Sequence, residues 1–286
     1  MRDWETLGAV DPRRLTDARL QLHWMAQAAA AMGKQLLAHQ PDFSEQSFQW
    51  SHELRALVQG RVEGARPFRA GLRPCPAALL LAADGEEVLR ELPLEGRTLD
   101  EAYDWMRREV EGFLGRSLEQ PLERPGEIPA HPVGNGTPFS LPCPDAFAEI
   151  ERYFANADLL LRRTAERNPG ASPVRCWPHH FDIATLIGLD PEADPEKARS
   201  IGVGLSPGDG SYAEPYFYVL PWPAPRARDL PELAGGGQWH TARWTGAVLA
   251  ASSFTPAGSN GAQAQRVEAF LDSAIAASRR LLGVNS

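Results

Sequence analysis

Residues 174–187, VRCWPHHFDIATLI, decide the predicted fold. The run is rich in β-branched and aliphatic residues, which is typical of a strand, and it carries a Trp-Pro-His element. An equivalent run at 47–58, SFQWSHELRALV, carries Trp50-Ser51-His52 in the same place. Each run is followed by further strand-like segments and lies between helical ones. The pattern therefore predicts two halves with the same order of elements.

Four stretches have apolar residues at the three-and-four spacing of an amphipathic helix. They cover residues 18–36, 102–113, 147–161 and 267–281. The second is preceded by Thr98 and Glu101, which form a capping box that satisfies the first backbone donors of a helix. These four stretches predict one helix before and one helix after each group of strands.

The remaining strand-like runs lie at 67–74, 77–83, 87–94, 200–207, 215–222, 238–244 and 246–254. Asp84-Gly85 is expected to form a hairpin turn between two of them. Residues 117–144 contain seven prolines and are expected to form a linker. We therefore expect an α+β protein with two antiparallel sheets and helices packed on them, divided into an N-terminal half at 1–116 and a C-terminal half at 145–286. The shared order of elements makes an internal duplication a hypothesis.

Composition excludes some function classes. The chain has 286 residues, 43% of them hydrophobic and 23% charged, which is ordinary for a globular protein. Its formal net charge of −8, without a basic block, argues against nucleic-acid binding. No apolar run is long enough to span a membrane, and the first residues lack the apolar core of a signal peptide. A cytoplasmic location is expected.

Familiar catalytic motifs are absent. The sequence holds no GxSxG nucleophile elbow, no HExxH zinc motif and no phosphate-binding loop. Cys75, Cys143 and Cys176 are odd in number and form no CxxC pair, so neither a disulfide framework nor a structural zinc site is indicated.

The adjacent His179 and His180 are the first candidate site. If residues 174–187 form one regular strand, alternate side chains share a face, so His180 and Asp182 point one way and His179 points the other. A histidine and a carboxylate on one face could hold a divalent metal or share a proton, with His240, Asp209 or His52 as a third donor. The structural alternative is that Asp182 binds backbone amides at a turn.

The loop and strand LSPGDGSYAEPYFYV, residues 205–219, form the second candidate. Glycines on both sides of Asp209 permit close backbone approach to a ligand, while Tyr212 and Tyr216 add hydroxyl groups and aromatic faces. The alternative is an ordinary hairpin in which the tyrosines alternate along a half-buried strand.

The stretches DARLQLHWMAQ, WPHHFDIA and SIGVGLSPGDGSYAEPYFYVLPWP resemble an uncharacterised bacterial family, a domain of unknown function. The family pattern has an aromatic residue, a histidine and a Phe-Asp pair on one strand, a second strand that ends in Pro-Gly, and a third that is aromatic. The resemblance supports the architecture and implies no activity, substrate or cofactor.

Three functional hypotheses follow. The first is a protein that binds a small molecule between the C-terminal sheet and the linker, with Trp177, His179, Tyr212 and Tyr216 as contact residues. The second is a hydrolase or lyase that uses His180, Asp182 and Asp209 for acid–base chemistry, or His180, Asp182 and His240 as ligands of a divalent metal. The third is a non-catalytic homodimeric interaction protein.

Overall fold

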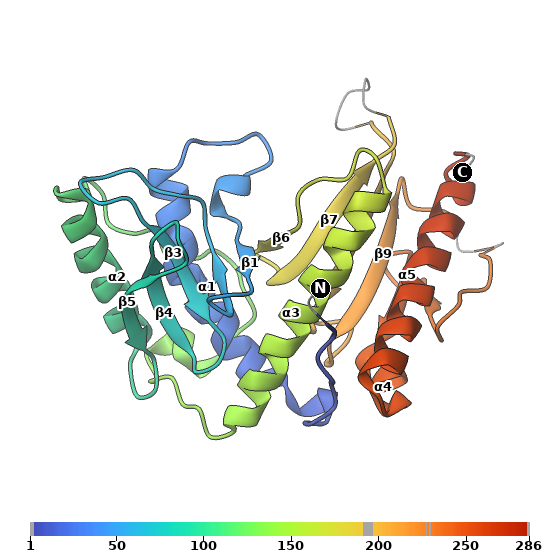
Figure 1. Ribbon diagram of the computed structural model, residues 1–286, viewed down its shortest axis with the longest axis horizontal. Helices are drawn as coiled ribbons and strands as arrows, with labels where there is room; N and C mark the ends of the chain where they lie inside the picture. Colours follow the sequence, from blue (N-terminus) through green and yellow to red (C-terminus); the bar gives the residue numbers. More distant parts are fainter. Residues whose placement is uncertain (1–2, 191–196, 227, 229, 285–286) are drawn as a thin grey trace. The chain divides into compact units, whose positions relative to one another are not determined.

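The computed structural model describes residues 3–190, 197–226, 228 and 230–284 (Figure 1). Helices and two antiparallel sheets make up the fold, which confirms the predicted α+β class. The chain divides into two compact units. We call residues 15–151 and 175–181 the N-terminal unit, and residues 1–14, 152–174 and 182–286 the C-terminal unit.

The N-terminal unit combines one antiparallel meander with two helices. Helix α1 (Thr16–Leu36) packs against strand β3 and against helix α2 (Leu99–Leu114). The sheet has the order β1-β2-β3-β4-β5, and its strands are Gln49–Ser51, Ala56–Val58, Arg69–Arg73, Ala78–Ala82 and Val88–Pro93. Every residue of β4 is buried, so this strand forms the centre of the core.

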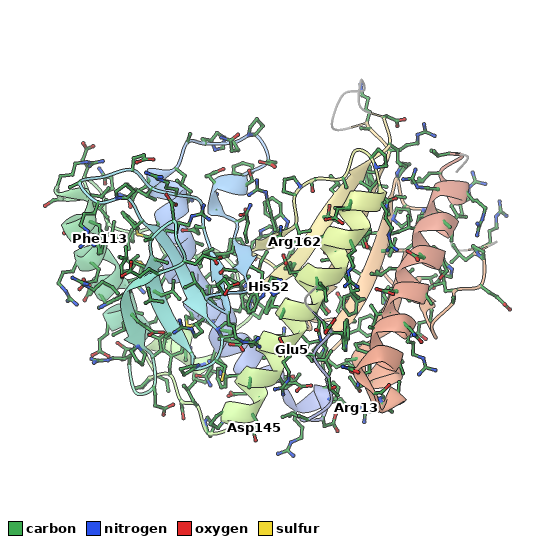
Figure 2. All side chains as sticks on the ribbon, in the orientation of Figure 1. Glu5, Arg13, His52, Phe113, Asp145 and Arg162 are labelled. Carbon is green, nitrogen blue, oxygen red and sulfur yellow. The ribbon has the colours of Figure 1, made fainter. Side chains whose placement is uncertain are left out.

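Local chemistry explains where α2 begins and how it packs. The Thr98 side chain accepts the Glu101 backbone N–H, and the Glu101 carboxylate accepts the Thr98 backbone N–H, so the predicted capping box is confirmed. Phe113, labelled in Figure 2, is buried against Phe68 at 5.6 Å between ring centroids. The apolar stripe of α2 is thus the face that closes the core.

Five strands of the second sheet lie in the C-terminal unit, in the order β10-β11-β9-β8-β7. They are Gln238–His240, Gly246–Ala250, Tyr216–Trp222, Ser200–Ser206 and Asp182–Gly188. Helix α4 (Ala251–Phe254) follows β11, and helix α5 (Asn260–Leu281) packs against β8, β9 and β11. Phe217 packs on Phe254, whereas Tyr216 and Tyr218, its neighbours in the strand, point to the opposite sheet face.

Helix α3 (Pro144–Arg167) includes the boundary between the two units, because residues up to Glu151 belong to the N-terminal unit. Near its end, Arg163 and Arg167 form ion pairs with Glu268 and Asp272 of α5, at 3.2 and 3.3 Å. The four predicted helices are therefore all present. No helix among the described residues is long and apolar enough to cross a membrane.

The proline-rich segment expected to be a linker packs within the N-terminal unit. Leu118, Leu122, Val133 and Phe139 are all buried, and the backbone of Phe139 exchanges hydrogen bonds with the backbone of residues 96 and 97. Its prolines stop regular structure, but its apolar side chains still bury surface against the unit.

The run 174–187 is not one regular strand, and this prediction was wrong. Strand β6 (Arg175–Trp177) is followed by a turn at 178–181, and β7 begins at Asp182. Phe181 has φ of 57°, a left-handed conformation that breaks the alternation of faces on which the pairing of His180 with Asp182 depended.

The two Trp-x-His elements have similar local geometry. Trp50 and Trp177 each lie on a short strand, and each has a histidine ring two residues later at 6.2 Å between centroids. Each turn contains one residue with positive φ, Arg55 or Phe181. Such likeness is what a duplication would produce, and the duplication itself stays a prediction.

Candidate functional site

The turn at 178–181 is held by helix α1. The Pro178 carbonyl accepts a hydrogen bond from Gln27 Nε2 at 2.7 Å and lies 2.8 Å from His23 Nε2. Because a carbonyl can only accept, His23 carries its proton on Nε2. Phe181 stacks on the His23 ring at 5.4 Å between centroids and 10° between planes. Two polar side chains of α1, four residues apart, thus hold the turn at 178–181 against the helix.

His23 is neutral in the folded protein. Its pKa is lowered from 6.5 to about 4, chiefly by burial; the hydrogen bond to Pro178 opposes this shift, and the nearby charges of Arg19, His180 and His179 add to it. The residue is 3% exposed. We therefore assign His23 a role in positioning the turn at 178–181.

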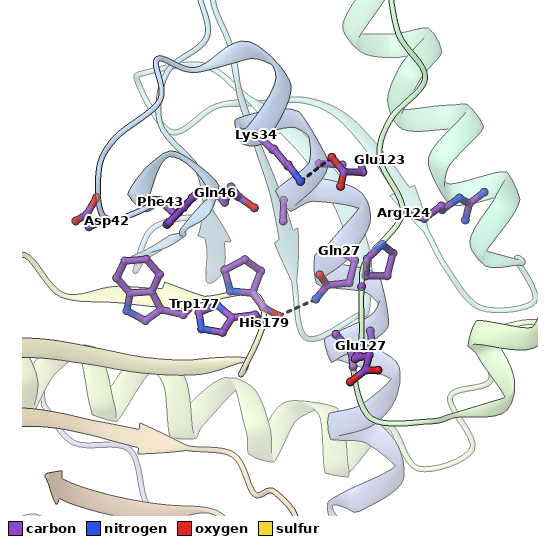
Figure 3. A pocket seen from close by; sticks show the side chains of 16 residues that line it. Gln27, Lys34, Asp42, Phe43, Gln46, Glu123, Arg124, Glu127, Trp177 and His179 are labelled. Atoms are coloured by element: carbon purple, nitrogen blue, oxygen red, sulfur yellow. Dashed lines mark hydrogen bonds and ion pairs between the residues drawn. The ribbon is translucent and has the colours of Figure 1, made fainter. Parts of the chain in front are cut away.

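A cavity of about 630 Å³ lies beside the turn at 178–181, entirely within the N-terminal unit (Figure 3). We call it the N-terminal pocket. It is formed by four groups of residues: Gln27, Ala30, Ala31 and Lys34 of α1; Asp42, Phe43 and Gln46; residues 123–128 of the proline-rich segment; and Trp177, Pro178 and His179. The two alanines leave room above the helix, because a larger side chain there would fill the space.

Aromatic rings and polar groups both face this cavity. In Figure 3, the Trp177 and Phe43 rings lie near Asp42 and His179, while Lys34 forms an ion pair with Glu123 at 2.6 Å. The Gln27 amide nitrogen donates hydrogen bonds to the backbone carbonyls of Pro178 and His23. Among the described residues, its amide oxygen accepts no hydrogen bond. This oxygen is an acceptor available to a ligand.

His179 and His180 lie on the exposed side of the turn. Their ring centroids are 4.3 Å apart. Loss of surrounding water lowers the pKa of His179, and the charge of a protonated His180 would lower it further. His179 is therefore neutral at pH 7 and lines the pocket as an aromatic and hydrogen-bonding group.

The candidate residues of the C-terminal unit form a separate network. Asp209 Oδ1 accepts the backbone N–H groups of Ser211 and Tyr212 at 2.6 and 3.0 Å, and its Oδ2 accepts the Tyr216 hydroxyl at 2.6 Å. Burial and the hydrogen bond to Asp209 raise the pKa of Tyr216, which keeps this phenol protonated. Both oxygens of Asp209 thus accept hydrogen bonds from the protein itself.

His240 is also occupied at both ring nitrogens. Nε2 contacts the Ala242 carbonyl and must donate to it, so Nδ1 accepts the Tyr212 hydroxyl at 3.0 Å. The ring stacks on Trp244 at 4.0 Å between centroids. In the part of the chain that the structure describes, no group of three or more His, Cys, Asp and Glu side chains is arranged to hold a metal ion.

Asp182 and His180 are not brought together on one strand. Asp182 begins β7 in the C-terminal unit, where its Oδ2 accepts a hydrogen bond from Tyr218, whereas His180 belongs to the turn of the N-terminal unit. Of the predicted contact residues, Trp177 and His179 line the N-terminal pocket, while Tyr212 and Tyr216 belong to the network around Asp209.

Several pocket residues were not predicted. Gln27 and Lys34 lie within a helix that was interpreted only as an apolar face, and Phe43 and residues 123–128 lie in loops. One signal was present: His23 and Gln27 interrupt the buried stripe of α1 at a spacing of four, and buried polar side chains require partners.

Comparisons with known proteins add no relative. No protein-family model, no curated protein and no solved structure matches this chain. The resemblance to an uncharacterised bacterial family therefore stays a prediction from the sequence.

Proposed function

We propose that the protein binds a small organic molecule in the N-terminal pocket. The observation that carries the proposal is the cavity itself. Its volume of about 630 Å³ lies within the range of roughly 300–1,000 Å³ typical of small-molecule sites. Its wall combines apolar residues with about as many polar and charged ones, which can orient a bound molecule.

Two of the predicted contact residues, Trp177 and His179, support this location over the C-terminal half. Trp177 supplies a large flat face, and the available acceptor on Gln27 can orient a bound molecule. The acid–base alternative has less support, because Asp209 and Asp182 both accept hydrogen bonds from tyrosines. A cytoplasmic location and a homodimer stay predictions of the sequence.

The test is a fragment screen on the full chain, labelled with nitrogen-15 and observed through the tryptophan indole N–H signals. The chain has eight tryptophans. The indole signal that is missing from the spectrum of Trp177→Phe is assigned to Trp177 and reports on the pocket. We expect a subset of neutral and charged fragments to shift the Trp177 signal.

A matched pair of variants then tests the location. Ala31 lines the pocket, whereas Ala269 lies on α5 in the C-terminal unit and is not buried. Ala31→Phe should abolish the shifts by filling the cavity, and Ala269→Phe should leave them unchanged. If no fragment moves the Trp177 signal, or if folded Ala31→Phe binds as the parent does, the proposal is wrong.

A further inference from the structure

Phe43 combines two unusual properties, although its ring meets the His39 ring edge-on at 5.2 Å between centroids. Its side chain is 57% exposed, although phenylalanine is usually buried. Its φ of 57° places a bulky residue in the left-handed region, which costs free energy. Both properties have a reason if the ring is held at the pocket to contact a ligand.

The Phe43 ring lies with two other aromatic groups at this pocket. Trp177 is half-buried and meets the His179 ring edge-on at 6.2 Å. In Figure 3, all three lie at the same end of the cavity, together with the Asp42 carboxylate. Aromatic faces carry negative charge density, and a carboxylate adds a full negative charge.

Positive charge at the pocket is already neutralised. Lys34 is paired with Glu123 at 2.6 Å. Arg124 is paired with Asp100 at 2.5 Å, and its guanidinium lies 3.9 Å from the centroid of the Tyr103 ring.

Two carboxylates of the pocket wall form no ion pair among the described residues, although the charge of Arg175 acts on one of them. Burial raises the pKa of Asp42, but hydrogen bonds from Ser44 and the charge of Arg175 outweigh burial and hold the pKa below its usual value. Asp42 is therefore ionised. Among the described residues Glu127, also on the pocket wall, has no ion-pair partner.

We propose that the ligand of the N-terminal pocket is a small organic cation of the methylated-ammonium type. This inference rests on the proposed binding function and narrows its chemistry. A methylated ammonium presents apolar methyl groups to aromatic faces and spreads its charge over them, so it gains from both the rings and the carboxylates. A hydroxyl or N–H elsewhere on the molecule can donate to the Gln27 amide oxygen.

The test measures binding of choline chloride to the full chain by calorimetry and by the Trp177 indole signal. Its neutral isostere, in which a quaternary carbon replaces the nitrogen, is the matched control. We expect choline to bind at least roughly tenfold more tightly than the isostere, and added salt to weaken only the choline complex.

Variants separate charge from shape. Asp42→Asn and Glu127→Gln should each weaken choline binding about three- to tenfold and leave isostere binding unchanged. The amide oxygen introduced by Asp42→Asn would still accept the Ser44 N–H, so the loop is kept. Phe43→Leu should weaken choline binding about three- to tenfold.

Equal affinity for choline and the isostere, or unchanged choline binding in both charge variants, would overturn the cation inference. The proposed binding function would still stand if neutral fragments shift the Trp177 signal while choline does not. If neither choline nor any fragment reaches the pocket, both proposals are wrong.

Discussion

Gly202 and Gly204 of strand β8 provide a matched test of how the C-terminal sheet is packed. Both lie on the face that carries Tyr218, two residues apart, opposite Leu220 and Tyr218 of β9. A Cβ atom on Gly204 would meet Tyr218 Oη at 2.5 Å, Tyr218 Cζ at 2.6 Å and the Ile183 carbonyl oxygen at 2.7 Å. On Gly202 the nearest atoms would be at 3.7 and 3.8 Å, which is ordinary contact.

We expect Gly204→Ala to destabilise the protein and Gly202→Ala not to destabilise it. In a strand, alanine is more favourable than glycine by roughly 0.5–1 kcal/mol, so Gly202→Ala should be neutral or slightly stabilising. Gly204→Ala must move Tyr218 and its hydrogen bond to Asp182. Overpacking costs about 1–3 kcal/mol and a hydrogen bond to a charged group about 1.5–3 kcal/mol, so we expect a net loss of about 3 kcal/mol.

Urea unfolding followed by far-ultraviolet circular dichroism measures both variants against the parent. The Gly204→Ala midpoint should fall clearly, and the Gly202→Ala midpoint should stay or rise. If the two variants unfold at the same urea concentration, the close packing of Tyr218 over Gly204 does not stabilise this sheet.

Two further predictions concern the N-terminal unit. Because the pKa of His23 is about 4 in the folded protein and 6.5 in the unfolded chain, the unfolded chain binds the proton first as the pH falls. His23 should therefore stabilise fully above pH 6.5 and lose this stabilisation between 6.5 and 4, by about 2 kcal/mol at pH 5. His23→Gln keeps a hydrogen-bond donor for Pro178 but removes the titrating group. In urea unfolding, the free energy of unfolding of this variant should therefore fall less between pH 7 and pH 5 than that of the parent. An equal fall in both proteins would contradict the prediction. Phe43→Gly removes the cost of the left-handed backbone and should raise the free energy of unfolding by about 0.5–1 kcal/mol while weakening ligand binding. Phe43→Leu keeps a side chain at the left-handed position and should not be stabilised. Equal free energies of unfolding for Phe43→Gly and Phe43→Leu would show that the left-handed backbone is not what destabilises the parent.

Local signals predicted most of the fold. The apolar spacing of the helices, the Thr98–Glu101 capping box and the Asp84-Gly85 turn depend on residues close in sequence, and α2 and the β4–β5 hairpin appear where they were expected. The β-branched and aliphatic runs between turn residues likewise identified the strands.

The turn at 178–181 could not be predicted in this way. A phenylalanine at positive φ is rare, and here Phe181 is held by stacking on His23 and by a hydrogen bond from its N–H to the Trp177 carbonyl at 2.6 Å. The first of these contacts comes from a distant helix, so no local pattern reports it. The pocket was missed for the same reason, because its walls come from four separate stretches.

The hydrogen bonds to Pro178 have a consequence for how the protein is made. His23 and Pro178 are separated by 155 positions in the chain, and Cys176 exchanges two backbone hydrogen bonds with Phe48, at 2.8 and 2.9 Å. When the chain has emerged from the ribosome only as far as Glu151, α1 and strands β1 to β5 are present but residues 175–181, which complete the unit, are not. During synthesis the N-terminal unit stays incomplete until α3 and residues 175–181 have emerged, and a gene fragment cut between the two sheets would encode it without one wall of its pocket.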